Sequence, residues 1–502
     1  MKTKLILTCL FTLFFYKGFA DTDKYRIIVT DDPATKITIA WNQGGLGDSP
    51  VVYYDKVDHG TNHNLYTYSK TEDRAVPYKG MDNRFVRLTG LTPNTNYYFI
   101  IKDSQSTSQR FWFRTAPNDT SRLSFIAGGD SRNNRMPRQN ANLLVSKLKP
   151  HAVLFGGDMT DSDTDIEWQE WLDDWQLTTA SDGRMFPIVP TRGNHELDIN
   201  VIYNLFDTPD ENVYYAVTFG DNLIRTYTLN TEISMFGDQK TWLETDLTAS
   251  ANLIWKIAQY HRPMRSHTAI KPEGNTQYTA WAQLFYDKKL RLVIECDSHM
   301  SKTTFPIMPS SDSGNEEGFV IEPLSGTVYT GEGCWGAPLR PNDDDKSWTR
   351  KSGSFNQFKL IFVDSEKIEL RTIKVDNVDS VGEVSNLNPF TLPANLDVFT
   401  PAPGEDVVTI YKDPPLSVSD ALLNGIKIYT NEEEQKIIVE GYLPNSTIFN
   451  LYNIQGKIII SQRLDSYYKS FSVDVSQLNP AIYVIELKST SSEKRIKKLI
   501  IN

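Results

Sequence analysis

The chain has 502 residues, 23% of them charged and 39% hydrophobic, a globular composition that excludes disordered, fibrous and coiled-coil proteins. This length is too great for one ordinary hydrophobic core, so we expect two to four domains. A net charge of −11 without a long basic run argues against a broad nucleic-acid-binding surface, although a local site can still take an anionic substrate.

Residues 1–20 have the three-part pattern of a secretory signal peptide. Two lysines precede an apolar run at 5–16, and Ala20 supplies a small residue at the end. The run is too short for a membrane-spanning helix, and no later segment is long and apolar enough to span a membrane. The alternatives are a membrane anchor or a buried N-terminal helix. Cleavage after Ala20 would leave a net charge of −14 and two of the three cysteines.

Residues 21–117 have an all-β pattern. Residues 36–41 alternate like a half-buried strand, and short strands are predicted at 51–54 and 97–101. Residues 85–97 run from a strand through a Leu-x-x-Leu-x-Pro corner into an aromatic strand, which resembles the corner of a fibronectin type III sandwich. This part holds no cluster of His and carboxylates, so we interpret it as a structural or positioning module.

Residues 121–376 have an α/β pattern. Helices are predicted at 139–148 and 165–177, and the tryptophan stripe of the second is expected in the core. Strands are predicted at 123–127, 152–155, 186–190, 253–258, 290–294 and 358–363. Residues 377–425 are rich in Pro, Asn and Asp and are predicted to be a linker, and 426–502 are predicted to form a small β-sandwich.

Polar motifs follow five predicted strands of the α/β part, each where a strand ends. The residues concerned are Asp130, Asp158, Asn194, His195, Glu196, His261, Asp297 and His299. Ligands collect beyond the carboxyl ends of strands in open α/β sheets. One Gly-Asp turn or one lone His is a weak signal, because such residues are common bystanders. Five of them in this order indicate one site.

Carboxylates, an amide oxygen and imidazoles suit Mn, Fe or Zn, with no need for a thiolate. Two metal ions at about 3.5–4 Å need a carboxylate that bridges them, and Asp158 is the candidate. Such a pair lowers the pKa of a bound water toward about 7 and stabilises both oxygens of an in-line displacement. This chemistry fits the hydrolysis of phosphate esters.

The same blocks resemble the ordered motifs of the calcineurin-like metallophosphoesterases, and the β-rich front part narrows the resemblance to the purple acid phosphatase branch. The resemblance covers roughly residues 21–376 and implies a four-layer α/β/β/α catalytic domain with two metal ions. By resemblance, one metal takes Asp130, Asp158 and His299, and the other takes Asp158, Asn194, His261 and Asp297. It also implies that His195 contacts the substrate phosphate and that Glu196 orients His195.

Three positions depart from the family pattern. Asp161 stands where the purple branch has its iron-binding Tyr, Arg132 where broader metallophosphoesterases have His, and Asp297 where the last block has its first His. Together they shift the site toward oxygen ligands and weaken the case for an iron–zinc pair. Asp161 either ligates the first metal, directly or through water, or forms a hydrogen bond in its loop.

Three further residues have two interpretations each. Arg132 either holds a phosphate oxygen or makes a salt bridge. His267 either protonates the leaving group or is a solvated loop residue. Trp335, in a glycine-rich segment, either stacks on the substrate or simply belongs to a turn. Cys296 and Cys334 could pair, but nothing in the sequence indicates a disulfide.

Residues 426–502 resemble the C-terminal sorting domain of type IX secretion in Bacteroidetes, on their strands, the turn at 453–457, the segment 478–483 and the basic end. The resemblance implies the type IX machinery as a partner, and a secreted or outer-surface location. The alternative is an ordinary carbohydrate- or protein-binding sandwich. For the whole chain we favour a secreted metal-dependent phosphoesterase over a surface adhesion protein with a degenerate, non-catalytic domain.

Overall fold

The computed structural model describes residues 22–45, 47–412, 426–431, 434–440, 447–464, 470–488 and 494–501. The predicted signal peptide lies outside these residues, as does the latter part of the predicted linker. Among the described helices, none combines the length and apolar character needed to cross a membrane.

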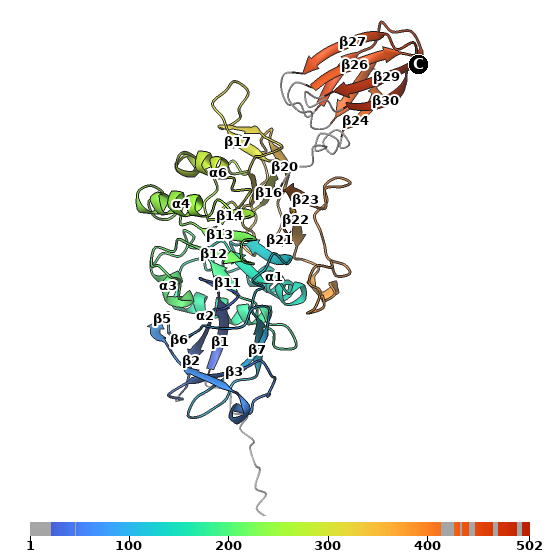
Figure 1. Ribbon diagram of the computed structural model, residues 1–502. Coiled ribbons are helices and arrows are strands. Elements are labelled where there is room, and N and C mark those ends of the chain that lie inside the picture. The colour runs from blue at the N-terminus through green and yellow to red at the C-terminus, as the bar shows by residue number, and fades with distance from the viewer. Residues whose placement is uncertain are drawn as a thin grey trace, which may run out of the picture.

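The N-terminal part packs two β-sheets face to face, in blue in Figure 1. One contains β1 (Thr22–Ile28), β2 (Ile37–Gln43), β6 (Met81–Leu88) and β5 (Arg74–Tyr78). The other contains β4 (Tyr68–Thr71), β3 (Val51–Asp55), β7 (Asn96–Lys102) and β8 (Phe111–Arg114). Trp41 and Phe99 are among the fully buried side chains of this part, whose strands confirm the all-β prediction.

The first of these sheets continues into the catalytic part as one ten-stranded sheet, because β1 pairs in parallel with β11 at Ile28 and Ile188. The added strands are β11 (Ile188–Pro190), β10 (Ala152–Phe155), β9 (Leu123–Gly128), β21 (Gln357–Val363), β22 (Lys367–Lys374) and β23 (Val408–Tyr411). All seven residues of β21 are buried, as expected for a strand covered on both faces.

A second sheet of seven strands packs on the first. Its order is β12 (Tyr215–Phe219), β13 (Ile224–Thr228), β14 (Trp255–Gln259), β15 (Leu292–Glu295), β19 (Val328–Gly331), β16 (Ser301–Thr304) and β20 (Thr349–Gly353). A two-stranded sheet adds β17 (Ile307–Pro309) and β18 (Phe319–Ile321).

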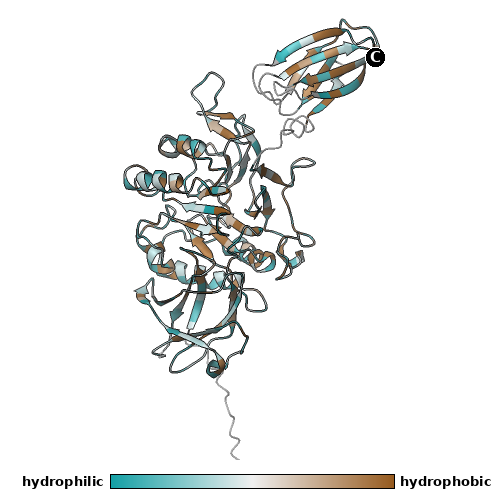
Figure 2. Cartoon of the chain, viewed as in Figure 1, coloured by the Kyte–Doolittle hydropathy of each residue, from teal (hydrophilic) through white to brown (hydrophobic). Residues whose placement is uncertain are grey.

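Helices cover the outer faces of the two sheets and complete the four layers. On the first sheet lie α1 (Arg135–Leu148) and α2 (Asp165–Trp175), and on the second lie α4 (Asp238–Ala249) and α6 (Gln283–Asp287). Shorter helices are α3 (Val201–Phe206) and α5 (Asn275–Gln277), which runs into a π-helical stretch at Tyr278–Ala282. Figure 2 shows more hydrophilic colour on these outer helices than on the strands between them.

Local sequence explains where the first two helices begin. A capping box between Thr164 and Glu167 starts α2, and its tryptophans at 168, 171 and 175 are buried, as predicted. Helix α1 starts four residues before the predicted boundary, because Pro137 fits within a first turn, where its missing N–H costs nothing.

The predicted linker begins too early in the sequence. Strand β23 pairs with β22, Val378 and Val381 are buried in the core of the catalytic part, and Val384 is buried as well. Composition indicated a linker because Pro, Asn and Asp outnumber these spaced valines. The part of 377–425 up to residue 411 therefore packs on the catalytic part of the chain.

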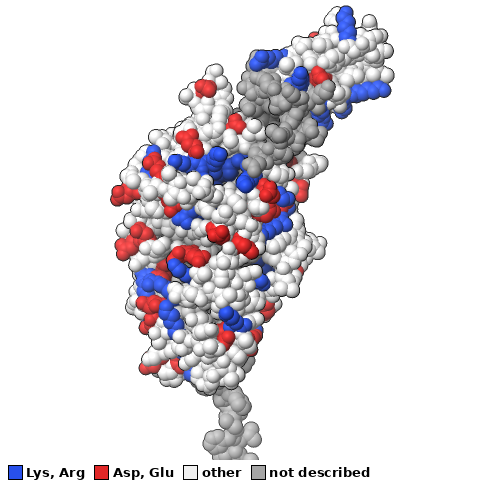
Figure 3. All heavy atoms as spheres, in the orientation of Figure 1, with Lys and Arg blue, Asp and Glu red and all other residues white. Residues whose placement is uncertain are grey.

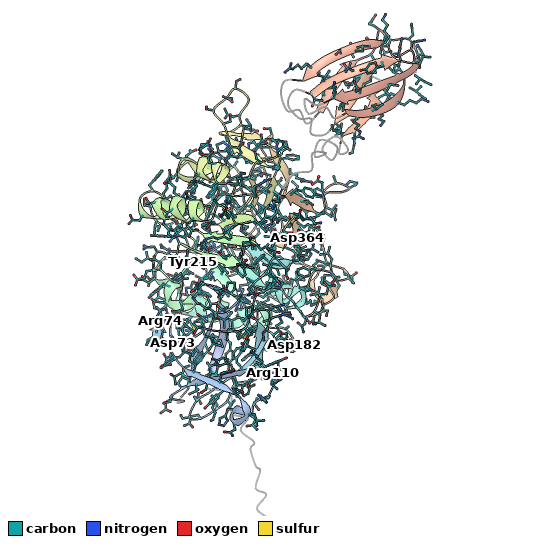
Figure 4. All side chains as sticks on the ribbon, viewed as in Figure 1. Asp73, Arg74, Arg110, Asp182, Tyr215 and Asp364 are labelled. Atoms are coloured by element: carbon teal, nitrogen blue, oxygen red, sulfur yellow. The ribbon has the colours of Figure 1, made fainter. Side chains whose placement is uncertain are left out.

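Hydrogen bonds between distant elements fix the layers relative to one another, at residues labelled in Figure 4. The Tyr215 hydroxyl donates to the carbonyl of Pro190 at 2.8 Å, which joins the two sheets. Arg74 of β5 donates to the Tyr203 carbonyl at 2.9 Å and to Asp207 at 3.0 Å. The N-terminal domain is thus anchored beside α3.

The Arg26 side chain is a second anchor at this junction, and its loss should destabilise the protein. Arg26 is fully buried and donates to the carbonyls of Leu205 and Lys24 and to Asn83 Oδ1. We expect Arg26→Met to lower the free energy of unfolding by about 3 kcal/mol, because three buried acceptors lose their donor. Chemical denaturation measures this, with partly exposed Arg114→Met as the control, and a loss below about 1 kcal/mol would contradict the assignment.

The C-terminal domain has its own core. One sheet contains β24 (Lys427–Asn431), β25 (Lys436–Glu440) and β28 (Ser470–Asp474). The other sheet contains β27 (Ile458–Leu464), β26 (Thr447–Asn453), β29 (Ala481–Lys488) and β30 (Lys494–Ile501). Ile437, Phe449 and Ile485 are among its fully buried side chains. A separate core of this kind is typical of an independent domain.

Candidate metal centre

Parallel strands bring the five polar motifs to one edge of the two sheets. Strands β9, β10 and β11 are parallel in the first sheet, as are β13, β14, β15 and β19 in the second. Five non-glycine residues of the turns that follow have left-handed backbone conformations, at Asp130, Arg132, Asp158, Asp297 and His299. Strained conformations of this kind cluster at functional sites, where the surrounding structure holds them in place.

One ligand group consists of Asp130, Asp158 and His299, all buried and with ligand atoms within 4.8 Å of one another. The His299 ring donates Nδ1–H to the Pro338 carbonyl at 3.0 Å, so Nε2 faces Asp130 Oδ1 at 3.3 Å. His299 Nε2, Asp130 Oδ1 and Asp158 Oδ2 are buried atoms without a hydrogen-bond partner. Three buried ligand atoms without a hydrogen bond converge in one place, and this fits a metal ion, although Asp158 Oδ2 also has the Arg132 guanidinium at 3.1 Å.

A second group surrounds the His261 ring and shares Asp158 with the first. His261 donates Nδ1–H to the Gly156 carbonyl at 2.9 Å. Its Nε2 lies 3.1 Å from Asn194 Oδ1, 3.2 Å from Asp158 Oδ1 and 3.7 Å from Asp297 Oδ1. One nitrogen and three oxygens therefore converge, a set that suits a hard or borderline cation.

Charges at the centre also fit a cation. Burial alone would lower the pKa of His261, but the negative charges of Asp158 and Asp130 outweigh it and raise this pKa well above its ordinary value. A proton on Nε2 would occupy the place where a metal ion would bind, and ligands lose such protons when a metal binds. The donor set therefore fits metal ions at both groups.

Glycines allow the backbone to approach this centre closely. A Cβ on Gly193 would lie 2.3 Å from Asp158 Oδ1, and one on Gly333 would lie 2.0 Å from Asp130 Oδ2. Cys296 packs its sulfur where a Cβ on Gly156 would come within 2.2 Å. Burial raises the pKa of Cys296 to about 12. The Cys296 sulfur lies within 4.8 Å of ligand atoms of Asp130 and His261, so these three residues form a further group that could hold a metal ion. Cys296 and Cys334 are both free, and no disulfide joins them.

Arg132, Asp161 and His195 form one cluster beside the ligand groups. The Arg132 guanidinium lies 3.1 Å from Asp158 Oδ2 and 2.8 Å from Asp161 Oδ1. Asp161 belongs to neither ligand group among the described residues. His195 donates Nδ1–H to the Asp161 carbonyl at 2.5 Å, and its Nε2 lies 4.0 Å from Asp158 Oδ2.

The Glu196 carboxylate accepts hydrogen bonds from backbone N–H groups and not from the His195 ring. Its carboxylate accepts hydrogen bonds from the backbone N–H groups of Asp158, Met159 and Gly193, at 2.6–2.9 Å. Burial and the nearby charge of Asp158 raise the pKa of Glu196 to about 7. Glu196 thus fixes the two turns relative to each other, a different role from the one that the resemblance implied.

The structure does not bring His267 and Trp335 to the centre. His267 is fully buried, bonds Thr349 through Nε2 at 2.6 Å and lies 3.7 Å from Glu332. Trp335 is fully buried and donates to Asn142 at 2.9 Å. Both rings are buried, and neither has an exposed edge that could protonate a leaving group or stack on a substrate.

Two basic residues at the centre have no sequence signal and were not predicted. Lys271 Nζ lies 2.5 Å from Asp297 Oδ1, and Arg340 donates to the Asp297 carbonyl at 2.5 Å. Each sits in a loop far from any predicted strand end. Their contacts with Asp297 depend on how the loops close, which no local pattern encodes.

Comparisons with known proteins agree with this geometry domain by domain. Residues 22–115 match the purple acid phosphatase N-terminal domain, residues 132–300 the calcineurin-like phosphoesterase family, and residues 400–502 a secretion system C-terminal sorting domain. An uncharacterized protein of Mycobacterium tuberculosis is 19% identical over 330 residues, which cover 55% of this chain and 60% of that relative. The chain thus aligns with less than two thirds of the relative.

Two solved structures share the fold. A purple acid phosphatase from yellow lupin (Lupinus luteus) seeds has a TM-score of 0.58 and 15% identity, with 73% of each chain covered. The structure of PhoD has a TM-score of 0.58 and 13% identity, with 78% of this chain and 91% of that one covered. At these identities the likeness establishes the fold.

The fold is that of the purple acid phosphatase structure, and the ligand groups lie within the part of the chain that matches the calcineurin-like phosphoesterase family. The chain combines a purple acid phosphatase N-terminal domain, a calcineurin-like phosphoesterase domain and a type IX secretion sorting domain. These matches support a phosphoesterase that is secreted or held at the cell surface, and the family implies divalent metal ions.

The iron-loaded protein should lack an intense purple colour. In the purple branch that colour comes from a tyrosinate on ferric iron, and Asp161 stands at the corresponding position, with its carboxylate on Arg132. No tyrosine lies between residues 158 and 165. A visible absorption spectrum checks this, and an intense band would mean that a tyrosine from elsewhere reaches the metal.

Proposed function

We propose that this protein is a secreted phosphoesterase that hydrolyses phosphate esters at a dinuclear metal centre. The observation that carries the proposal is the shared Asp158, around which two groups of buried ligand atoms converge. Asp130, Asp158 and His299 would hold one ion, and Asp158, Asn194, His261 and Asp297 the other. Fe, Zn and Mn all suit these donors.

Two such cations would supply Lewis acidity toward the phosphoryl oxygens and an activated water for in-line attack. His261 and His299 keep their Nε2 atoms directed at the centre because each Nδ1–H is donated to a backbone carbonyl. His195 is oriented in the same way by the Asp161 carbonyl, which leaves its Nε2 to contact a phosphate oxygen. Arg132 positions Asp158 and adds positive charge beside it.

Basic side chains beside the ligand groups would bring positive charge to an anionic substrate. The face shown in Figure 3 carries both basic and acidic side chains. Arg132, Lys271 and Arg340 all contact residues of the two ligand groups. Together with bound cations they would attract a phosphate ester.

Turnover of a panel of chromogenic phosphate esters tests the proposal. We expect the protein purified without chelator to hydrolyse at least one member of the panel, to lose activity with a chelator, and to regain it with Mn²⁺, Zn²⁺ or Fe. A protein that binds no metal and hydrolyses nothing would instead be a surface binding protein with a degenerate centre.

Removal of residues 413–502 should leave catalysis intact and block export. Strand β23 ends at Tyr411, so a cut after Lys412 keeps the ten-stranded sheet whole, and the C-terminal domain has its own core. We expect turnover of the purified truncation within about twofold of the full chain, and retention of the truncated protein inside the cell. Assays of purified protein and of cell fractions check the two parts. A soluble truncation without activity would place the last domain in the catalytic unit.

A further inference from the structure

Lys271 makes the most direct contact between a cation and a ligand carboxylate of the candidate centre. Its Nζ lies 2.5 Å from Asp297 Oδ1, the same oxygen that lies 3.7 Å from His261 Nε2. The ammonium group and the second ligand group therefore share one oxygen atom. Two cations on one carboxylate oxygen repel each other, so Lys271 competes with an ion bound through His261.

The position of Lys271 allows it to leave Asp297. Its side chain is 20% exposed, whereas that of Asp297 is 5% exposed, so the ammonium lies between the buried ligand and solvent. The residue belongs to a loop without regular structure, where its backbone N–H is bonded to the Thr268 carbonyl at 3.1 Å. A four-carbon side chain at such a place reaches several positions at little cost.

Arg132, the comparable cation of the first group, is held more firmly. Its guanidinium contacts two carboxylates, Asp158 at 3.1 Å and Asp161 at 2.8 Å. For Lys271, Asp297 is the one carboxylate within salt-bridge distance in the described part of the chain. Engagement of Asp297 by a metal would thus release Lys271, while Arg132 would keep its second partner.

We propose that Lys271 is a metal-released substrate-binding residue: it occupies Asp297 until a metal ion takes that carboxylate, and then binds the phosphate of a dianionic monoester. This inference rests on the proposed function. The carboxylate of Asp297 brings one more negative charge than the imidazole found at this position in the family, and Lys271 offsets that charge. Once freed beside two bound cations, its ammonium favours a dianionic phosphate monoester over a monoanionic diester.

The test uses the full chain and two variants, Lys271→Met and Lys271→Arg. Titration calorimetry with Mn²⁺ on the chelator-treated protein should show about tenfold tighter binding for Lys271→Met, since the competing charge is gone. Inorganic phosphate should bind the Mn²⁺-loaded Lys271→Met variant about tenfold more weakly, because one charged hydrogen bond is lost. Lys271→Arg retains the charge and should recover most of the phosphate affinity. The control is Lys240→Met, on the outer helix α4, which should change neither affinity.

Ester hydrolysis adds a third readout. For Lys271→Met, kcat/KM should fall about tenfold for 4-nitrophenyl phosphate and less than about threefold for bis(4-nitrophenyl) phosphate. Mn²⁺ affinity that is unchanged or weaker in Lys271→Met, or unchanged phosphate affinity, would overturn the inference. A wild-type chain that binds no Mn²⁺ would overturn the proposed function itself, so the two failures are distinguishable.

Discussion

Replacing Asp158 with alanine is expected to abolish phosphate-ester hydrolysis, by more than about 10³-fold in kcat/KM, and to reduce the bound metal. Asp158 belongs to both ligand groups, is fully buried and accepts a hydrogen bond from the His195 backbone N–H at 2.8 Å. Its loss removes the carboxylate common to both groups. Asp158→Asn keeps the shape and removes the charge, and we expect a similar loss. Elemental analysis and turnover of the purified variants measure both effects.

Asp287→Ala, on the outer helix α6, is the matched control, because its carboxylate is exposed and bonded to Gln283. It should retain full activity and metal content. Thermal unfolding of all the variants separates a local effect from misfolding. Full activity of Asp158→Ala with unchanged metal content would show that the dinuclear assignment is wrong.

Gly193→Ala is the second change with a large expected effect. A Cβ at this position would lie 2.3 Å from Asp158 Oδ1, 2.6 Å from Asp158 N and 2.9 Å from His261 Cε1. The backbone of the Asp158 turn cannot move aside freely, because Glu196 accepts its hydrogen bonds. We therefore expect the carboxylate to be displaced and kcat/KM to fall by more than about 10²-fold.

Gly382→Ala controls for the loss of a glycine in general. A Cβ there meets its nearest atom at 3.6 Å, which is ordinary contact. The steady-state assay on 4-nitrophenyl phosphate compares the two variants with the unaltered chain. If Gly193→Ala kept wild-type activity, the close packing of this turn against Asp158 would have no functional role.

The ligand groups could be predicted because strand ends encode them locally. A buried apolar run followed by Gly-Asp marks Asp130 and Asp158, and parallel pairing then brings such ends to one edge of the sheets. His267 shows the limit of this approach. It follows His261 by only six residues, yet its partner Thr349 lies 82 residues further along the chain. Loop closure decides that contact, and no local pattern reports it.

The roles of Glu196 and Lys271 also could not be predicted from the sequence. Next to His195, Glu196 reads as a partner of that ring, but the turn directs its carboxylate at three backbone N–H groups. Lys271 is a lone lysine in a polar loop, and only the folded chain places it on Asp297. The packing of residues 377–411 was hidden for a related reason: the buried Val378, Val381, Val384 and Val408 are too widely spaced to form a recognisable strand pattern.

Metal stoichiometry tests the central claim most directly. The protein should be purified without chelator, and its metal content measured by elemental analysis for Mn, Fe and Zn per mole of chain. We predict two metal ions per chain in the unaltered protein and fewer in Asp158→Ala, with hydrolysis rising in proportion to occupancy on reconstitution. A chain that takes up no more than one ion at saturation, or one that hydrolyses phosphate esters fully without metal, would contradict the dinuclear centre.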